Sequence, residues 1–69
     1  MDERIQELIE RVDEARATLA AYRTQEELEQ RRAAVRAALG TLDAYLWERR
    51  HEGETVAQVR SRLAPEVDW

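Results

Sequence analysis

Apolar residues recur every three or four positions through most of this 69-residue chain, and that spacing is typical of amphipathic α-helix. The first apolar stripe has an acidic side opposite it, formed by Glu3, Glu7, Glu10 and Glu14. From this pattern we predict a first helix over residues 3–22. Its apolar face consists of Ile5, Leu8, Ile9, Val12, Ala15, Leu19 and Tyr22.

A signal for a new helix start follows the first stripe. Thr24 precedes Glu27 by three residues, which is the spacing of a capping box. The threonine oxygen would accept from the N–H of Glu27, and the glutamate would accept from the N–H of Thr24. The same tetrapeptide also occurs inside helices, so one straight helix from residue 2 to about 51 is the competing interpretation. We favour a reversal near residues 21–25, which makes an antiparallel helical hairpin.

The second helix is predicted over residues 25–51, and it carries two stripes. The main apolar stripe consists of Leu28, Val35, Leu39, Leu42 and Leu46. The second stripe lies roughly opposite and contains mostly small residues, namely Ala33, Ala37, Gly40, Ala44 and Trp47.

Small side chains on that second stripe would permit close approach by another backbone. Alanine is also the best helix former, so the stripe has an ordinary explanation as well. Gly40 favours a contact, because a mid-helix glycine costs up to about 1 kcal/mol relative to alanine. Alternatively, Gly40 ends one helix and Thr41 begins another.

The last part of the chain predicts a short third helix over residues 56–64. Gly53 suits the end of the preceding helix, and Thr55 with Gln58 repeats the capping-box spacing. Pro65 stops the helix. The tail over residues 65–69 alternates acidic and apolar side chains and ends in Trp69.

The predicted fold is therefore all-α, an antiparallel helical hairpin plus a short C-terminal helix in a single domain over residues 1–69. So short a chain buries a marginal core, and it has no cysteine and one histidine with which to reinforce it. We therefore expect a homodimer in which two hairpins form a four-helix bundle. The expected oligomer core is Ile5, Leu8, Val12, Leu19, Leu28, Val35, Leu39, Leu42 and Leu46.

Charge is unevenly distributed along the chain, whose formal net charge is -4. Residues 1–30 carry nine acids against four arginines, and residues 31–50 carry five arginines against two acids. Opposite charge on consecutive helices favours their pairing. The overall acidity argues against a general nucleic-acid binder. All eleven basic residues are arginine, and lysine, asparagine and phenylalanine are absent. We interpret this as the codon usage of a GC-rich bacterial or phage genome; the alternative is selection for the bidentate, planar contacts that only arginine makes.

Several residues are candidates for contact with a partner. Arg16 lies within the first apolar stripe. Either its stem packs while its guanidinium reaches water, or it makes an ion pair that sets the register of an interface. Tryptophan is enriched at binding hot spots, although Trp69 could instead fold back over its own hairpin. The full set of candidates is Arg16, Ala37, Gly40, Ala44, Trp47, Val67 and Trp69.

No pattern indicates catalysis, and we expect no enzyme, no metal and no cofactor. The glutamates of the first helix have no nearby histidine and no apolar pocket to raise a pKa. We also expect no membrane segment and a cytoplasmic location.

The function we expect is a small non-enzymatic interaction module, an adaptor or regulator, that binds itself and an unidentified protein. The alternative is an antitoxin-like or phage-encoded inhibitor that binds a target enzyme through its C-terminal segment. A nucleic-acid-binding regulator that uses the arginines of the second helix is a minor alternative.

Overall fold

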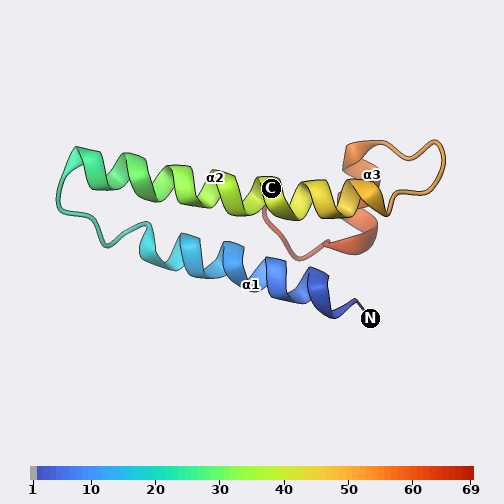
Figure 1. The fold of residues 1–69 in the computed structure, drawn as a ribbon, viewed down its shortest axis with the longest axis horizontal. Helices are drawn as coiled ribbons and strands as arrows, with labels where there is room; N and C mark the ends of the chain where they lie inside the picture. Colours follow the sequence, from blue (N-terminus) through green and yellow to red (C-terminus); the bar gives the residue numbers. More distant parts are fainter. Residues whose placement is uncertain (1) are drawn as a thin grey trace.

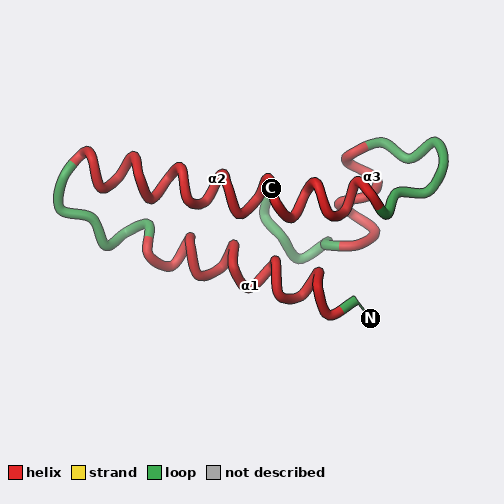
Figure 2. Tube along the Cα trace, in the orientation of Figure 1, coloured by secondary structure: helices red, strands yellow, loops and turns green. Residues whose placement is uncertain are grey.

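The computed structural model describes residues 2–69, and these residues form three helices and no strand. The helices are α1 (Glu3–Thr18), α2 (Gln25–Glu48) and α3 (Val56–Leu63). The long helices α1 and α2 lie side by side, and α3 crosses the C-terminal end of α2 at a steep angle (Figures 1 and 2). The prediction of an all-helical chain is confirmed. The molecule is elongated, with extents of 45 × 21 × 15 Å.

Helix α1 begins as expected but ends earlier than residue 22. Asp2 caps its N-terminus by accepting from the N–H of Arg4 at 2.9 Å. At the other end, the N–H of Leu19 donates to Arg16 O and that of Ala21 to Thr18 O. Bonds that span only three residues tighten and close the last turn of a helix. The prediction of a helix through residue 22 was therefore wrong, and Tyr22 lies in the connecting loop.

The chain reverses through residues 19–24, and Thr24 starts α2. Its hydroxyl accepts from the N–H of Glu27 at 3.1 Å, as the capping box predicts. The return bond differs from the prediction, because the Glu27 carboxylate accepts from the N–H of Arg23 and not from that of Thr24. The carboxylate therefore ties down the last residues of the loop.

Helix α2 passes through Gly40 without a break and ends at Glu48. Its predicted end near residue 51 was three residues too long, because the N–H groups of Arg49 and Arg50 turn back onto Leu46 O and Trp47 O. Gly53 does not terminate α2. It lies in the following loop at φ 84°, a left-handed conformation that suits glycine.

Helix α3 has the complete capping box that the sequence predicts. Thr55 Oγ1 accepts from the N–H of Gln58 at 3.2 Å, and Gln58 Oε1 accepts from the N–H of Thr55 at 2.8 Å. The helix ends at Leu63, and Ala64 and Pro65 follow it. Its position against α2 decides where the core lies.

The buried core occupies one end of the hairpin. It is built from the first turns of α1, the last turns of α2 and one face of α3. The other end, near the loop, has only half-buried apolar residues. The buried residues are Ile5, Leu8, Ile9, Val12, Leu42, Leu46, Val59 and Ala64.

This asymmetry predicts where truncation of a leucine is damaging. Leu46 is fully buried, so Leu46→Ala should lower the free energy of unfolding by about 2–5 kcal/mol. Leu28→Ala, at the half-buried end of the same stripe, is the matched control and should cost about 1 kcal/mol. Urea denaturation followed by circular dichroism measures both. Equal losses would contradict a core confined to one end.

Candidate functional site

The residues expected to form an oligomer core divide into two groups. Five of them are buried within the single chain, and four are only half-buried. The expected core left out Ile9, Val59 and Ala64. Ile9 lies on the predicted apolar face of the first helix, whereas only the fold of the third helix brings Val59 and Ala64 to the core. The buried five are Ile5, Leu8, Val12, Leu42 and Leu46, and the half-buried four are Leu19, Leu28, Val35 and Leu39.

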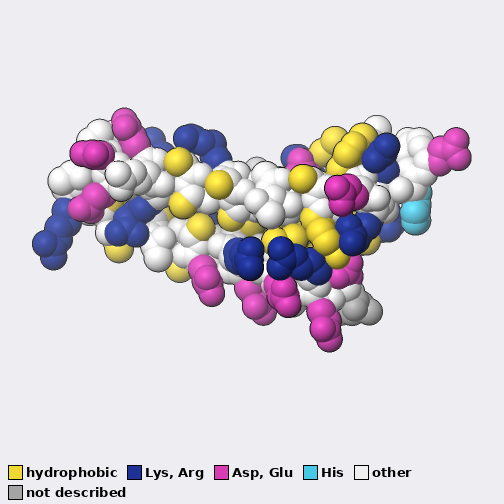
Figure 3. Space-filling model, viewed as in Figure 1, with side chains coloured by type: hydrophobic (Ala, Val, Ile, Leu, Met, Phe, Trp, Pro, Cys, Tyr) yellow, Lys and Arg dark blue, Asp and Glu magenta, His cyan; other side chains and the backbone are white. Residues whose placement is uncertain are grey.

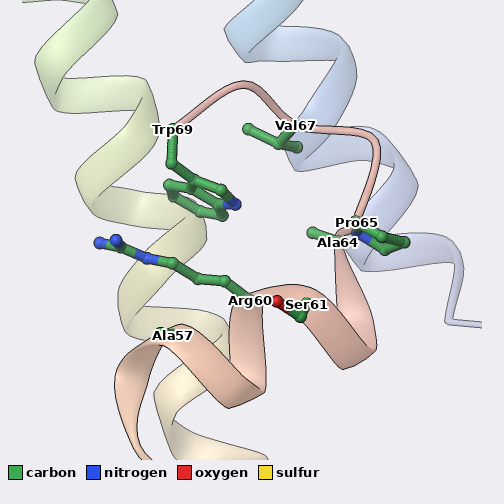
Figure 4. Close-up of a pocket in the computed structure, with 7 residues that line it drawn as sticks. All are labelled: Ala57, Arg60, Ser61, Ala64, Pro65, Val67 and Trp69. Atoms are coloured by element: carbon green, nitrogen blue, oxygen red, sulfur yellow. The ribbon is translucent and has the colours of Figure 1, made fainter.

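The C-terminal tail is a strap, defined here as residues 65–69, that crosses from α3 toward α2. Val67 packs against the core, and the Arg16 guanidinium donates to the carbonyl oxygen of Asp68. Trp69 is 38% exposed, and its ring lies over the Arg60 guanidinium, 4.4 Å from Cζ to the ring centroid (Figure 4). Three of the candidate partner contacts therefore already make contacts within their own chain, namely Arg16, Val67 and Trp69.

Arg60 is the anchor beneath the strap. Its Nε and Nη2 donate to the two carboxylate oxygens of Asp43, each at 2.9 Å, and so tie α3 to α2. These hydrogen bonds raise the pKa of Arg60, against the opposing effect of burial. The sequence carries no local signal for this pair, because the two residues meet only through the turn between the helices.

Between the strap and α3 lies a shallow pocket of about 320 Å³ (Figure 4). The guanidinium of Arg60 lines this pocket, but it already donates hydrogen bonds to Asp43 and stacks against the ring of Trp69. The pocket therefore follows from how the strap is anchored, and we assign no ligand to it. It is lined by Ala57, Arg60, Ser61, Ala64, Pro65, Val67 and Trp69.

A second polar cluster joins the start of α1 to the end of α2. The Tyr45 hydroxyl donates to the Asp2 carboxylate at 3.1 Å, and Arg49 Nε lies 3.4 Å from the same group. Burial acts to raise the pKa of Asp2, but hydrogen bonds from Arg4, Tyr45 and Ile5 outweigh it, and the pKa is lowered. Burial and the bond to Asp2 both raise the pKa of Tyr45. The cluster fastens the N-terminus and is structural.

A third cluster holds the loop between α2 and α3. Glu54 receives hydrogen bonds from the Arg62 guanidinium at 2.6 and 2.9 Å and from the N–H of His51 at 2.6 Å. The bonds from Arg62 are the main cause that lowers the pKa of Glu54 to about 2. Arg62 also donates to the carbonyl of Arg49, so one side chain bridges both ends of the loop.

The outer face of α2, defined as its stripe of small residues with Trp47, is uncovered. Every member of this face is exposed. Trp47 is 41% exposed and stacks with Arg50, whose Cζ lies 4.2 Å from the centroid of the indole ring. On the side of the molecule shown in Figure 3, small apolar side chains reach the surface along α2. The members of the outer face are Ala33, Ala37, Gly40, Ala44 and Trp47.

Most charged side chains on the long helices face solvent. Acidic side chains gather along the edge of α1 that points away from α2 (Figure 3). Arg32 and Arg36 are exposed on α2, and neither forms an ion pair within residues 2–69. Over the same residues, no group of three or more histidine, aspartate or glutamate side chains is placed to hold a metal ion. No helix of this described part is long and apolar enough to cross a membrane.

Comparison with protein families, with curated proteins and with solved structures gave no match for this chain. Its function therefore has to be argued from its own surfaces.

The Glu54 cluster predicts a dependence of stability on pH. A carboxylate whose pKa is lowered on folding contributes stability above its ordinary value of 4.5, and that contribution is lost as the pH falls toward about 2. Glu54→Gln should therefore melt at a lower temperature than the parent at pH 7, and the difference should shrink as the pH falls below 4.5, so that only a minor part of it remains at pH 2.5. Thermal unfolding at pH 7, 4 and 2.5 measures this. The control is Glu52→Gln, an exposed change in the same loop, and an equal effect there would contradict the assignment.

The strap predicts that its last residue stabilises the fold. Trp69→Ala removes a partly covered indole and its stacking on Arg60, so it should lower the free energy of unfolding by about 1–2 kcal/mol. Trp69→Phe, which keeps an aromatic ring, should recover part of this loss. Chemical denaturation of the full chain measures both variants. An unchanged midpoint for Trp69→Ala would mean that the strap is not docked in solution.

Proposed function

We propose that this chain is a small, non-enzymatic protein–protein interaction module, an adaptor or regulator, that acts as a homo-oligomer joined through the outer face of α2. Gly40 is the observation that carries the proposal. It lies in mid-helix, where glycine costs roughly 1 kcal/mol relative to alanine. A Cβ built on it would meet nothing within 4 Å. Packing within the described chain therefore gives no reason for glycine there, whereas close approach by a second backbone does.

The rest of the outer face supports the same proposal. Ala37 and Ala44 flank Gly40 and are exposed, so a helix could approach along several turns without meeting a large side chain. Trp47 ends the stripe as an exposed aromatic anchor, and tryptophan is among the residues enriched at the centres of protein interfaces. The small residues leave room for a partner helix, and the indole of Trp47 projects beside them as a point of contact.

The position of this face determines what an assembly would look like. The core residues Leu42 and Leu46 point from α2 toward α1 and α3, and the outer face lies on the opposite side of α2. Two copies joined there would bring four long helices together, with the two α2 helices in the middle. Because association stabilises the folded chain by mass action, it would also reinforce a small core.

Recognition is assigned to α2 and not to the C-terminal segment because the strap is already engaged. Val67 packs on the core of its own chain, and Trp69 stacks on Arg60. An inhibitor that presents this segment to a target would first have to release these contacts. The outer face of α2 needs no such rearrangement.

The proposal predicts that a charge on the outer face abolishes association but not folding. The parent chain should sediment as a dimer at about 100 μM, and Ala37→Glu should sediment as a monomer, because it would bury an unpaired carboxylate in the contact. Both should keep the same helical circular dichroism, since Ala37 is exposed within one chain. Ala17→Glu, an exposed change on α1, is the matched control and should remain a dimer. A parent chain that stays monomeric at several hundred micromolar would overturn the proposal.

A further inference from the structure

We infer that two copies pair their α2 helices antiparallel, with the two-fold axis beside Gly40 and with Arg36 of each copy against the Asp43 carboxylate of the other. This inference rests on the proposed self-association and adds its orientation and register. A second copy of the chain is the partner that fits the outer face, because in this arrangement Arg36 of each copy lies beside Asp43 of the other.

The two charges lie on one side of α2. Arg36 and Asp43 are seven residues apart, close to two helical turns, so they project along the same edge of the outer face. Arg36 is exposed and forms no ion pair with any residue the structure describes. Asp43 is about one-third exposed (32%) although both its oxygens accept from Arg60. A carboxylate offers about four acceptor sites, so Asp43 can receive a second guanidinium.

The register follows from Gly40 as the point of closest approach. In an antiparallel pair centred there, a residue a given number of positions before Gly40 lies opposite the residue that many positions after it. Arg36 then lies opposite Ala44 and beside Asp43 of the second copy. Ala33 lies opposite Trp47, so each exposed indole covers a methyl group and not another large ring. A single two-fold axis therefore allows the two backbones to approach at Gly40, pairs Arg36 with Asp43 and places the indole of each copy on a small residue of the other.

A parallel pairing through the same face would lose all of these matches. It would place the Arg36 and Asp43 edge of one copy on the opposite side of the contact from the same edge of the other copy, so Arg36 would not meet Asp43 across the interface. It would also bring the two Trp47 rings to the same level, where the small residues could no longer accommodate them. Antiparallel helices have opposed macrodipoles as well, which favours the arrangement.

Cysteine trapping tests the axis, because the chain has no native cysteine. Gly40→Cys should fold, since a Cβ there meets nothing within 4 Å. On mild oxidation, or with a short bis-maleimide, it should form a covalent dimer within minutes. Ala17→Cys, exposed on α1, is the matched control and should cross-link at least tenfold more slowly. Only a residue next to a two-fold axis meets its own copy at disulfide distance.

A pair of charge reversals tests the register. Arg36→Glu and Arg32→Glu make the same change in net charge on exposed residues of the same helix. Arg36→Glu should weaken the dimer roughly tenfold, because it replaces attraction to Asp43 by repulsion. Arg32→Glu should change the dissociation constant less than about twofold, because Arg32 lies farther round the helix from the outer face. Sedimentation equilibrium at low ionic strength measures both constants.

The outcomes separate this inference from the proposal on which it rests. If the parent chain never associates, the proposed function fails. If it associates but Gly40→Cys cross-links no faster than Ala17→Cys, or both arginine variants weaken it equally, the antiparallel pairing at Gly40 is wrong while self-association stands. Rapid trapping at Gly40 together with selective damage by Arg36→Glu establishes the arrangement.

Discussion

The structure depends on the packing of Val59 and Ala64 onto the C-terminal half of α2. These two residues complete the burial of Leu42 and Leu46, and a two-helix hairpin alone would leave one side of those leucines open to water. Burial of a leucine or valine side chain contributes about 1.5–3 kcal/mol, so in a chain of this size the third helix decides whether the fold is stable. The contact is possible only because the loop after α2 turns the chain back.

The polar contacts hold that turn and the strap in place. Glu54 and Arg62 bind the loop to α3, and Arg60 binds α3 to Asp43 on α2. Arg60 then supports Trp69 from below, while Arg16 holds the strap from the side of α1. Arginine suits these positions because its planar group can make two hydrogen bonds to a carboxylate and still stack on a ring. The closed end of the molecule is therefore organised by a few arginines around an apolar core.

In this arrangement one side of α2 is buried and the opposite side is exposed. The leucine side is covered by α1 and α3 at the closed end, and the outer face is covered by nothing in the described chain. Gly40 lies at the middle of that outer face, where it weakens the helix without serving internal packing. A helix that carries such a cost on its exposed side is well suited to a contact with a second molecule, and the distribution of Arg36 and Asp43 suits a second copy.

The sequence by itself determined the helical class, the number of helices and the residues that start them, because periodicity and capping are local properties of the chain. Thr24 and Thr55 cap where their spacing to Glu27 and Gln58 predicted. The tertiary structure decided which apolar residues share a core, since Leu28 and Leu42 belong to one stripe but only Leu42 meets the third helix. It also decided the early end of α1, the partner of Arg16 and the pairing of Arg60 with Asp43. The contacts of Arg16 and Arg60 join segments far apart in the chain, and their distances depend on loop conformations that no local pattern specifies.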